Sequence, residues 1–239
     1  MLDFNQFEVL SFDCYGTLID WESGILAALK TLLSAHNITQ GIASISIDDE
    51  HLLEMFAQEE SLLEEKEYLT YREILKKVVR AFSVQLSFIP TEAEVNSLAE
   101  SIQNWEPFAD TVAALKALKK RYKLAIISNI DDDLFAYTAK KLEVDFDWII
   151  TAQQVKSYKP ALQNFEVAIE RMGISDHKLL HVAQSVYHDI IPAKSMGLST
   201  VWVNRRKNKQ GSGATVAASE NPDLEVPDLK TLVSLMGLD

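Results

Sequence analysis

Short apolar runs alternate with helical segments along most of this chain, and no other feature constrains its fold as strongly. Each run has the length and content of a buried strand; the runs cover residues 7–12, 124–127, 148–150, 179–182 and 200–203. Helical patterns lie between them, at 110–121, where Asp110 is the expected cap, before Gly173 and at 190–196. Because strands that alternate with helices build a parallel sheet covered on both faces, we expect an α/β fold of this kind.

A long helical segment interrupts this alternation after the first run. Apolar residues recur at helical spacing through residues 21–105. Thr70 and Thr91 each precede a glutamate by three residues, which predicts two helix starts with capping boxes. We therefore expect a core made of residues 1–20 and 106–239, and an inserted helical domain of residues 21–105.

Three polar segments are predicted to lie at the surface. The acidic run of Glu59, Glu60, Glu64, Glu65 and Glu67 is expected to form the solvated face of a helix. The cluster of Arg205, Arg206, Lys207 and Lys209 is expected in a solvated turn. Residues 207–222 are rich in Gly, Ser, Asn and Ala, which predicts a mobile loop.

Composition excludes several classes of protein. With 239 residues and 47% apolar content, the chain can bury a globular core. A formal net charge of −12 argues against a nucleic-acid partner. Cys14 is the single cysteine, which favours a reducing compartment. The N-terminus has no secretory signal pattern, and no stretch approaches the roughly 18 apolar residues of a membrane span, so we expect a cytoplasmic protein without a membrane partner.

Polar residues follow several of the predicted strands. They are Asp13, Ser128, Asn129, Lys159 and Asp189. Ligands of open parallel sheets bind beyond the carboxyl ends of the strands. We therefore expect these residues, which are distant in the sequence, to converge on one edge of the sheet.

These residues resemble the four motifs of the haloacid dehalogenase superfamily. The matching segments are Asp13-x-Tyr15-Gly16-Thr17-Leu18, Ser128-Asn129, Tyr158-Lys159-Pro160 and Asp189, spread over nearly the whole chain. Within the superfamily the chain is most similar to the L-2-haloacid dehalogenase branch. Residues 13–22 and 183–189 resemble the subgroup that contains L-azetidine-2-carboxylate hydrolase. The resemblance implies a Rossmann-like core, a helical cap in the place of the insert, and a possible homodimer.

The resemblance also implies roles for individual residues. Asp13 is the expected nucleophile, which forms an ester with the substrate. Lys159 is expected to keep Asp13 ionised, and Asp189 to hold or deprotonate the hydrolytic water. The expected substrate-binding residues are Tyr15, Trp21, Ser128, Asn129 and Gln184.

Two positions argue against a phosphatase. Phosphatases of this superfamily carry a second aspartate where this chain has Tyr15, and an acidic magnesium ligand where it has neutral Gln184. Mg²⁺ prefers anionic oxygen ligands, so we expect neither a metal nor another cofactor. A halide leaving group needs no proton donor, which suits Asp13 followed by Tyr15. Residues 13–15 therefore favour displacement at carbon.

The substrate remains open between several alternatives. A small 2-substituted carboxylic acid, most simply an (S)-2-haloacid, is the expected substrate. However, residues 36–46 lack the arginine that cradles halide in the L-2-haloacid dehalogenases, and Arg72 is the nearest substitute. A protonated four-membered ring amine is the alternative leaving group, with Asp20 or Trp21 as its contact. A phosphatase and a non-catalytic binding module are further alternatives. His181 and Tyr71 are expected to be packing residues.

Overall fold

The central sheet of the protein is parallel throughout, as the alternation of runs and helices predicts. The computed structural model describes residues 2–38 and 48–239. Six strands follow the order β3-β2-β1-β4-β5-β6. They are β1 (Val9–Phe12), β2 (Lys123–Ser128), β3 (Trp148–Thr151), β4 (Leu179–Ala183), β5 (Ser199–Val203) and β6 (Leu224–Val226). The sequence analysis did not anticipate β6, because three residues are too few for a periodic signal.

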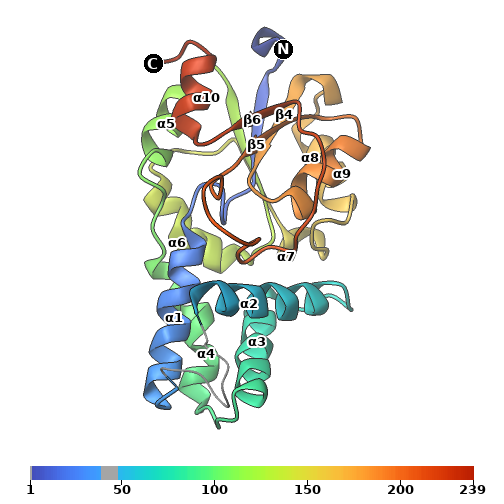
Figure 1. Cartoon of the computed structure of the whole chain (residues 1–239). Coiled ribbons are helices and arrows are strands. Elements are labelled where there is room, and N and C mark those ends of the chain that lie inside the picture. The colour runs from blue at the N-terminus through green and yellow to red at the C-terminus, as the bar shows by residue number, and fades with distance from the viewer. Residues whose placement is uncertain (1, 39–47) are drawn as a thin grey trace.

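The helices form two groups, which Figure 1 separates clearly. Between β1 and β2 lie α1 (Trp21–Ala35), α2 (Asp49–Glu64), α3 (Tyr71–Gln85), α4 (Glu92–Ser101) and the 3₁₀ turn η2 (Ile102–Asn104). Flanking the sheet are α5 (Thr111–Leu118), α6 (Asp132–Leu142), α7 (Ala152–Val155), α8 (Gln163–Met172), α9 (Ile191–Ser195) and α10 (Leu229–Leu235). Short turns complete the chain: η1 (Phe4–Gln6), η3 (Asp176–Lys178) and the π-helical turn η4 (Val186–Ile190). The first group is the inserted helical cap.

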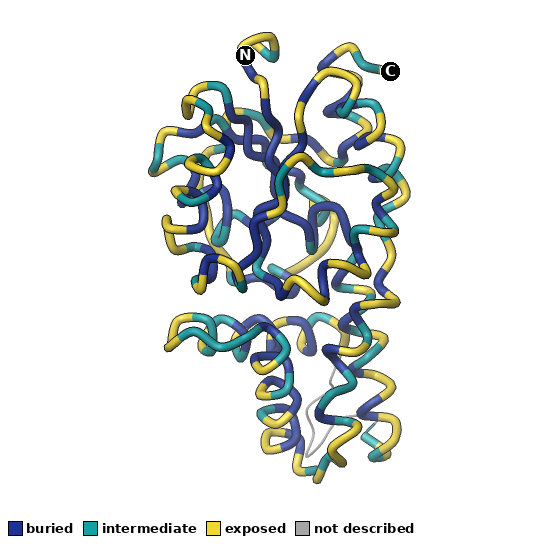
Figure 2. The backbone as a smooth tube through the Cα atoms, turned by 180° about the vertical axis from the view of Figure 1, so that it is seen from behind, coloured by how far each residue is buried: buried dark blue, intermediate teal, exposed yellow. Residues whose placement is uncertain are grey.

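Successive residues of each strand point to opposite faces of the sheet. Leu10 and Phe12 of β1 pack with α5, α6 and α10 in one large apolar cluster. Val9 of the same strand packs on the other face, with α8 and α9. Figure 2 shows the buried residues gathered along the strands and on the inner sides of the cap helices. Both faces of the sheet are therefore covered.

Helix starts in the cap follow the predicted capping signals, with one addition from the core. Thr91 and Glu94 form the complete capping box of α4. Thr70 caps α3 through the backbone N–H of Glu73. In addition, the buried carboxylate of Asp131 accepts hydrogen bonds from the first two N–H groups of α3, at 3.0 and 2.9 Å. A core residue thus fixes where α3 begins.

Asp110 lies at the N-cap position of α5, where the sequence predicts it. Its side chain makes no capping hydrogen bond to α5. One carboxylate oxygen instead accepts from Arg205 at 2.8 Å, and the other accepts from the N–H of Leu229 at 2.7 Å. The charge of Arg205 is a stronger partner than an exposed helix end.

Two segments connect the core with the cap, and they run side by side. Asp20 N–H donates to the carbonyl of Glu106 at 2.9 Å, and Phe108 N–H donates to the carbonyl of Leu18 at 3.0 Å. Ile19 and Pro107 form an antiparallel bridge between these bonds. The cap therefore enters and leaves the core at one point.

Only half of the basic cluster is solvated: Lys207 and Lys209 are exposed, as predicted, whereas Arg205 and Arg206 are not. The side chains of Arg205 and Arg206 are only 9% and 10% exposed. Arg206 pairs with Glu22 of α1 and Glu50 of α2, each at 2.6 Å, so it ties the core to the cap. Three residues of the loop expected to be mobile, at 213–215, are buried beneath these contacts.

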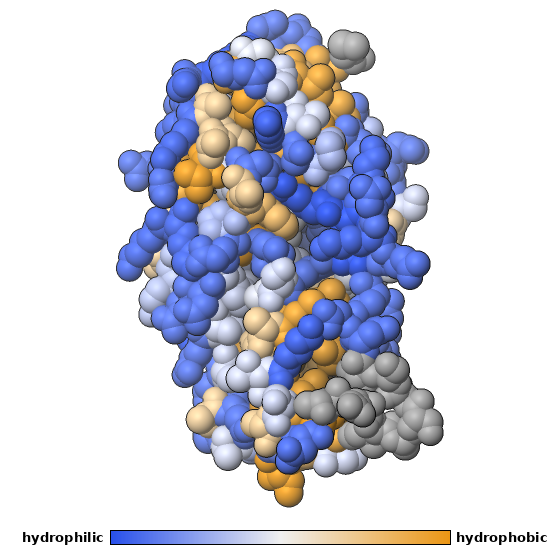
Figure 3. Space-filling view, turned by 60° about the vertical axis from the view of Figure 1, so that its left-hand side comes forward, coloured by the Kyte–Doolittle hydropathy of each residue, from blue (hydrophilic) through white to orange (hydrophobic). Residues whose placement is uncertain are grey.

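Polar side chains cover most of the face seen in Figure 3, and apolar ones appear in separate patches. Within the described ranges, no helix is both long and apolar enough to span a bilayer.

Candidate active site

The carboxyl ends of four strands deliver the predicted polar residues to one edge of the sheet. Asp13 follows β1 directly, and Ser128 is the last residue of β2. Lys159 lies in the loop after β3 and α7, and Asp189 lies in the π-helical turn after β4. Gly16 has φ +92°, so the chain turns back sharply after Asp13.

Lys159 joins two buried carboxylates. Its ammonium lies 2.9 Å from Asp13 Oδ1 and 2.7 Å from Asp189 Oδ1, and it also donates to the carbonyl of Ile127 at 2.9 Å. The Lys159 side chain is 2% exposed. Although burial opposes its charge, the two carboxylates raise the pKa of Lys159 above its ordinary value. The predicted triad is therefore assembled around a buried cation.

His181 completes the core side of this network. Its Nε2 lies 2.9 Å from Asp189 Oδ1, and its Nδ1 lies 2.9 Å from Ser11 Oγ on the neighbouring strand. Burial opposes ionisation of Asp189, but Lys159 and His181 hold the pKa of that carboxyl below its usual range. Asp189 Oδ2 is buried and accepts no hydrogen bond from the part of the chain that the structure describes. His181 is therefore more than the packing residue that sequence analysis predicted.

Asp13 is held at both carboxylate oxygens. Thr17 Oγ1 donates to Asp13 Oδ2 at 2.7 Å, while Lys159 binds Oδ1. Burial raises the pKa of Asp13, and the nearby charge of Asp189 adds to the rise, whereas Lys159 lowers it. A carboxylate with a raised pKa is more basic and therefore a stronger nucleophile.

Asn129 serves mainly to position Lys159. Its amide oxygen accepts from the Lys159 N–H at 2.8 Å, and its Nδ2 donates to the Lys159 carbonyl at 3.0 Å. Nδ2 also lies 3.2 Å from a carboxylate oxygen of Glu64. Ser128 lines the same cavity and is buried.

Both aromatic residues predicted to bind substrate line the cavity, but Gln184 does not. Tyr15 and Trp21 form part of the cavity wall, and the Tyr15 hydroxyl lies 2.8 Å from Thr138 Oγ1. Gln184 instead lines a separate small pocket beside Gly16. The sharp turn at Gly16 separates Gln184 from the cavity, so the geometry gives no support to its expected contact with substrate.

The cap contributes acids to the cavity, contrary to the prediction for the acidic run. Glu60 and Glu64, one turn apart on α2, line the cavity with Tyr71 of α3. Glu60 is 4% exposed and accepts a 2.5 Å hydrogen bond from the Tyr71 hydroxyl. A signal was present in the sequence: Glu60 and Glu64 continue the i, i+4 row of Phe56, which is a buried apolar residue.

No cationic residue from the described part of the cap lines this cavity. Arg72 pairs with Asp133 at 2.6 Å, and its side chain is 33% exposed. Asp20 caps α1 and lies outside the cavity wall. Most of the stretch without Arg or Lys, at 39–46, lies outside the described residues.

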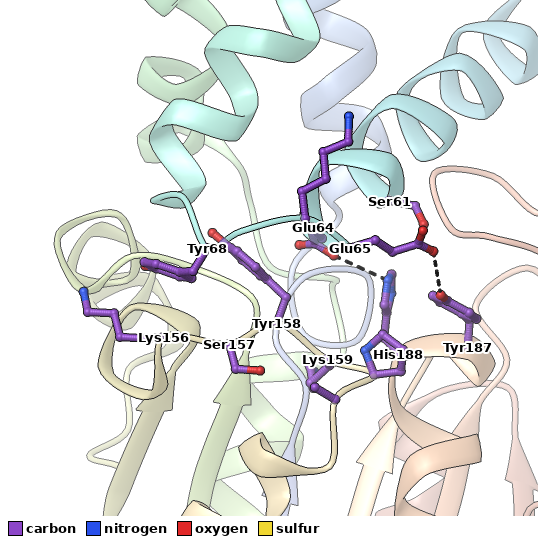
Figure 4. Close-up of a pocket in the computed structure, with 13 residues that line it drawn as sticks. Ser61, Glu64, Glu65, Tyr68, Lys156, Ser157, Tyr158, Lys159, Tyr187 and His188 are labelled. Atoms are coloured by element: carbon purple, nitrogen blue, oxygen red, sulfur yellow. Dashed lines mark hydrogen bonds and ion pairs between the residues drawn. The ribbon is translucent and has the colours of Figure 1, made fainter.

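Two cavities meet at Lys159. The inner one contains Asp13 and has a volume of about 30 Å³, which suits one or two waters. The outer one has a volume of about 350 Å³. Glu64, Lys159 and His188 line both; Figure 4 shows Glu64 and His188 facing each other between cap and core. A substrate larger than water therefore needs this wall to move.

The polar residues of the cavity do not fit a magnesium ion. Mg²⁺ requires near-octahedral oxygen ligands. The Lys159 ammonium already lies between Asp13 and Asp189, and Gln184 points elsewhere. Residues 2–38 and 48–239 contain no cluster of three or more His, Cys, Asp or Glu suited to a metal.

Known proteins resemble this chain over most of its length. Haloacetate dehalogenase H-2 of Moraxella sp. (strain B) is 25% identical over 236 residues, covering 98% of this chain and 99% of that protein. (S)-2-haloacid dehalogenase of Pseudomonas sp. (strain YL) is 26% identical over 174 residues, covering 70% and 71%. The structure of L-2-haloacid dehalogenase from Xanthobacter autotrophicus with chloropropionic acid covalently bound has a TM-score of 0.78 at 20% identity, covering 97% of this chain and 98% of its own.

The fold and the sequence lead to the same family. The structural likeness supports the parallel sheet with an inserted cap. The family pattern described as haloacid dehalogenase-like hydrolase matches residues 7–197. The chain belongs to the haloacid dehalogenase-like hydrolases.

Proposed function

We propose that this hydrolase displaces a leaving group from C2 of a small 2-substituted carboxylic acid through an ester on Asp13, without a metal. An (S)-2-haloacid is the proposed substrate. The observation that carries the proposal is the buried Asp13–Lys159–Asp189 array, in which one cation serves two carboxylates. The resemblance to named 2-haloacid dehalogenases supports the same substrate class.

The first step is a displacement at carbon. An oxygen of Asp13 forms a bond to C2 while the bond from C2 to the halogen breaks, and the electron pair leaves with the halide. The Ser128 hydroxyl is available to bind the substrate carboxylate, and the charge of Lys159 lies in the same cavity wall. Raised basicity at Asp13 favours this step once the carboxyl is ionised.

The second step hydrolyses the ester. Water attacks the carboxyl carbon of Asp13, and the bond from that carbon to the ester oxygen breaks. Asp189 Oδ2, which lacks a hydrogen-bond partner among the described residues, is suited to accept the water proton. The products are a 2-hydroxy acid and free Asp13, and one proton passes to solvent. Since only the first step breaks a bond at C2, configuration inverts once.

A strained cyclic amine is the second candidate substrate. The observation that favours it is the pair Glu60 and Glu64 on the cap side of the cavity. With protonated azetidine-2-carboxylate, Asp13 would form its bond to C2 while the bond from C2 to nitrogen breaks. The electron pair stays on nitrogen, which becomes a neutral primary amine, and the ester is hydrolysed as before.

The test is product release from two substrates in excess EDTA. We expect purified protein to release chloride from racemic 2-chloropropionate, consuming one enantiomer, or to open the ring of azetidine-2-carboxylate. The Asp13→Asn variant should lose at least about 10³-fold of either activity while keeping its thermal transition. Turnover that survives in Asp13→Asn, or that requires added Mg²⁺, contradicts the proposal.

A further inference from the structure

Three side chains from the cap face the reaction cavity without a positive partner. Glu60 and Glu64 come from α2 and Tyr71 comes from α3. The side chain of Glu64 is 5% exposed, and Glu60 is 4% exposed. No Lys or Arg within the described ranges pairs with either carboxyl group. Lys159, the nearest cation of the cavity wall, is already shared by Asp13 and Asp189.

The neighbours of these acids do not neutralise them. Burial lowers the pKa of His188 to about 4, so the His188 contact with Glu64 at 3.7 Å is not an ion pair at neutral pH. Burial raises the pKa of Glu60 to about 8. Burial and the charge of Glu60 raise the pKa of Glu64 above its usual range, against the opposing effect of Lys159. Two such acids one turn apart do not help the protein to fold.

A separate group in the same cavity also calls for a ligand that donates hydrogen bonds. Asp189 belongs to the core, its side chain is 1% exposed, and it lines the cavity with Glu60 and Glu64. Its Oδ2 has no partner in the described parts of the chain. Asp189 Oδ2 from the core and the carboxyl groups of Glu60 and Glu64 from the cap therefore line one cavity, where ionised carboxylate oxygens accept hydrogen bonds. A halide, which is itself an acceptor, satisfies none of them.

We propose that Glu60 and Glu64, positioned by Tyr71, bind a protonated amino group, so that the preferred substrates are small carboxylic acids that also carry an ammonium centre. This inference rests on the proposed function, because it places the substrate in the cavity of Asp13. The carboxylate of the ligand then faces Ser128 and Lys159, and its ammonium faces the cap. On binding, Glu60, whose pKa burial raises to about 8, ionises and releases a proton.

The experiment compares two ligands that differ only at nitrogen, bound to the inactive Asp13→Asn protein. Azetidine-2-carboxylate carries the ammonium, and cyclobutanecarboxylate has the same ring without it. By titration calorimetry we expect the amine to bind at least about tenfold more tightly, since a hydrogen bond to a charged group is stronger than one between neutral groups. Titrations in two buffers of different ionisation enthalpy should show proton release for the amine alone.

Variants assign the effect to the cap. Adding Glu60→Gln or Glu64→Gln should reduce the affinity ratio about tenfold, and Glu60→Gln should also abolish the proton release. Glu54→Gln is the matched control, because Glu54 lies on the same helix and is exposed. Thermal transitions of all variants check that the fold is retained.

The outcomes separate this inference from the proposed function. Equal binding of the two ligands, no binding of either, or a ratio unchanged by both Gln variants would overturn the ammonium site. Chloride release by the wild-type protein, together with equal binding of the two ligands, would support the Asp13 mechanism and contradict the ammonium site. A clear preference for the amine, without turnover of either substrate by the wild-type protein, would support the ammonium site and contradict the proposed reaction.

Discussion

The two walls of the cavity differ in how far their charges are satisfied. On the core wall, Lys159 balances Asp13 and Asp189, and His181 adds a further partner. On the cap wall, Glu60 and Glu64 face the cavity, and neither forms an ion pair with a Lys or Arg of the described residues. A buried carboxylate is costly unless it is paired. The carboxylates of the core wall are therefore balanced by a cation of the protein, whereas those of the cap wall are not.

The largest expected effect comes from removing the cation of the core wall. Lys159→Met leaves two buried carboxyl groups facing each other, so it should lower the free energy of unfolding by about 3–5 kcal/mol. Activity should fall by at least about 10³-fold, because Asp13 loses the positive charge that favours its ionised, nucleophilic form. Urea denaturation and initial rates measure both. A variant as stable as the wild type would mean that Lys159 does not balance the two acids.

The second expected effect separates the two chemical steps. His181→Leu removes one of the bonds that hold Asp189 Oδ1, so hydrolysis of the ester should slow about 10²-fold. Ester formation should continue, and intact-protein mass spectrometry should detect the substrate adduct on Asp13. His181→Gln, which retains a donor, should restore part of the rate. If the adduct does not accumulate in His181→Leu, His181 does not act through Asp189.

The third expected effect is on stability and tests the cap wall. Because folding raises the pKa of Glu60 from 4.5 to about 8, the folded state retains a proton that the unfolded state has lost between these values. The stability of the wild type should therefore fall as pH rises from about 4.5 to about 8, by up to about 1.4 kcal/mol per unit from this group.

Glu60→Gln should remove this part of the slope, and chemical denaturation at a series of pH values measures it. The exposed Glu54→Gln variant serves as control and should keep the slope. An identical pH dependence in wild type and Glu60→Gln would show that Glu60 is not an uncompensated buried acid.

The smallest expected effect concerns Arg72. This residue is paired with Asp133 near the surface, so Arg72→Ala should change kcat/KM for either substrate by no more than about twofold. Steady-state kinetics measures it. A loss of 2-chloropropionate turnover in this variant would instead indicate that Arg72 contacts the halide. The cap wall would then contain a cation, as the core wall does.

The core wall could be predicted from the sequence far better than the cap wall. Strand ends place Asp13, Lys159 and Asp189 at one edge of any parallel sheet, so their convergence follows from local patterns alone. The partnership of His181 with Asp189 depends on the π-helical turn at 186–190, which has no clear sequence signal.

The cap wall depends on how α2 is turned toward the core, which only tertiary contacts decide. Glu60 was predicted to be solvated because acidic runs usually are, although its spacing from Phe56 continues a buried row. The same limit explains Arg206, whose partners Glu22 and Glu50 are more than 150 residues away in the chain. Long-range ion pairs leave no periodic trace in a sequence.

The paired connecting segments at Ile19 and Pro107 have a consequence for how such proteins diversify. Since the cap begins and ends at neighbouring points, the strand order of the core does not depend on what is inserted there. A different helical module could be grafted between residues 20 and 106 without rearranging Asp13, Lys159 and Asp189. In the proposed function, bond breaking belongs to the core and ligand choice to the cap, so the two would be separable parts of one chain.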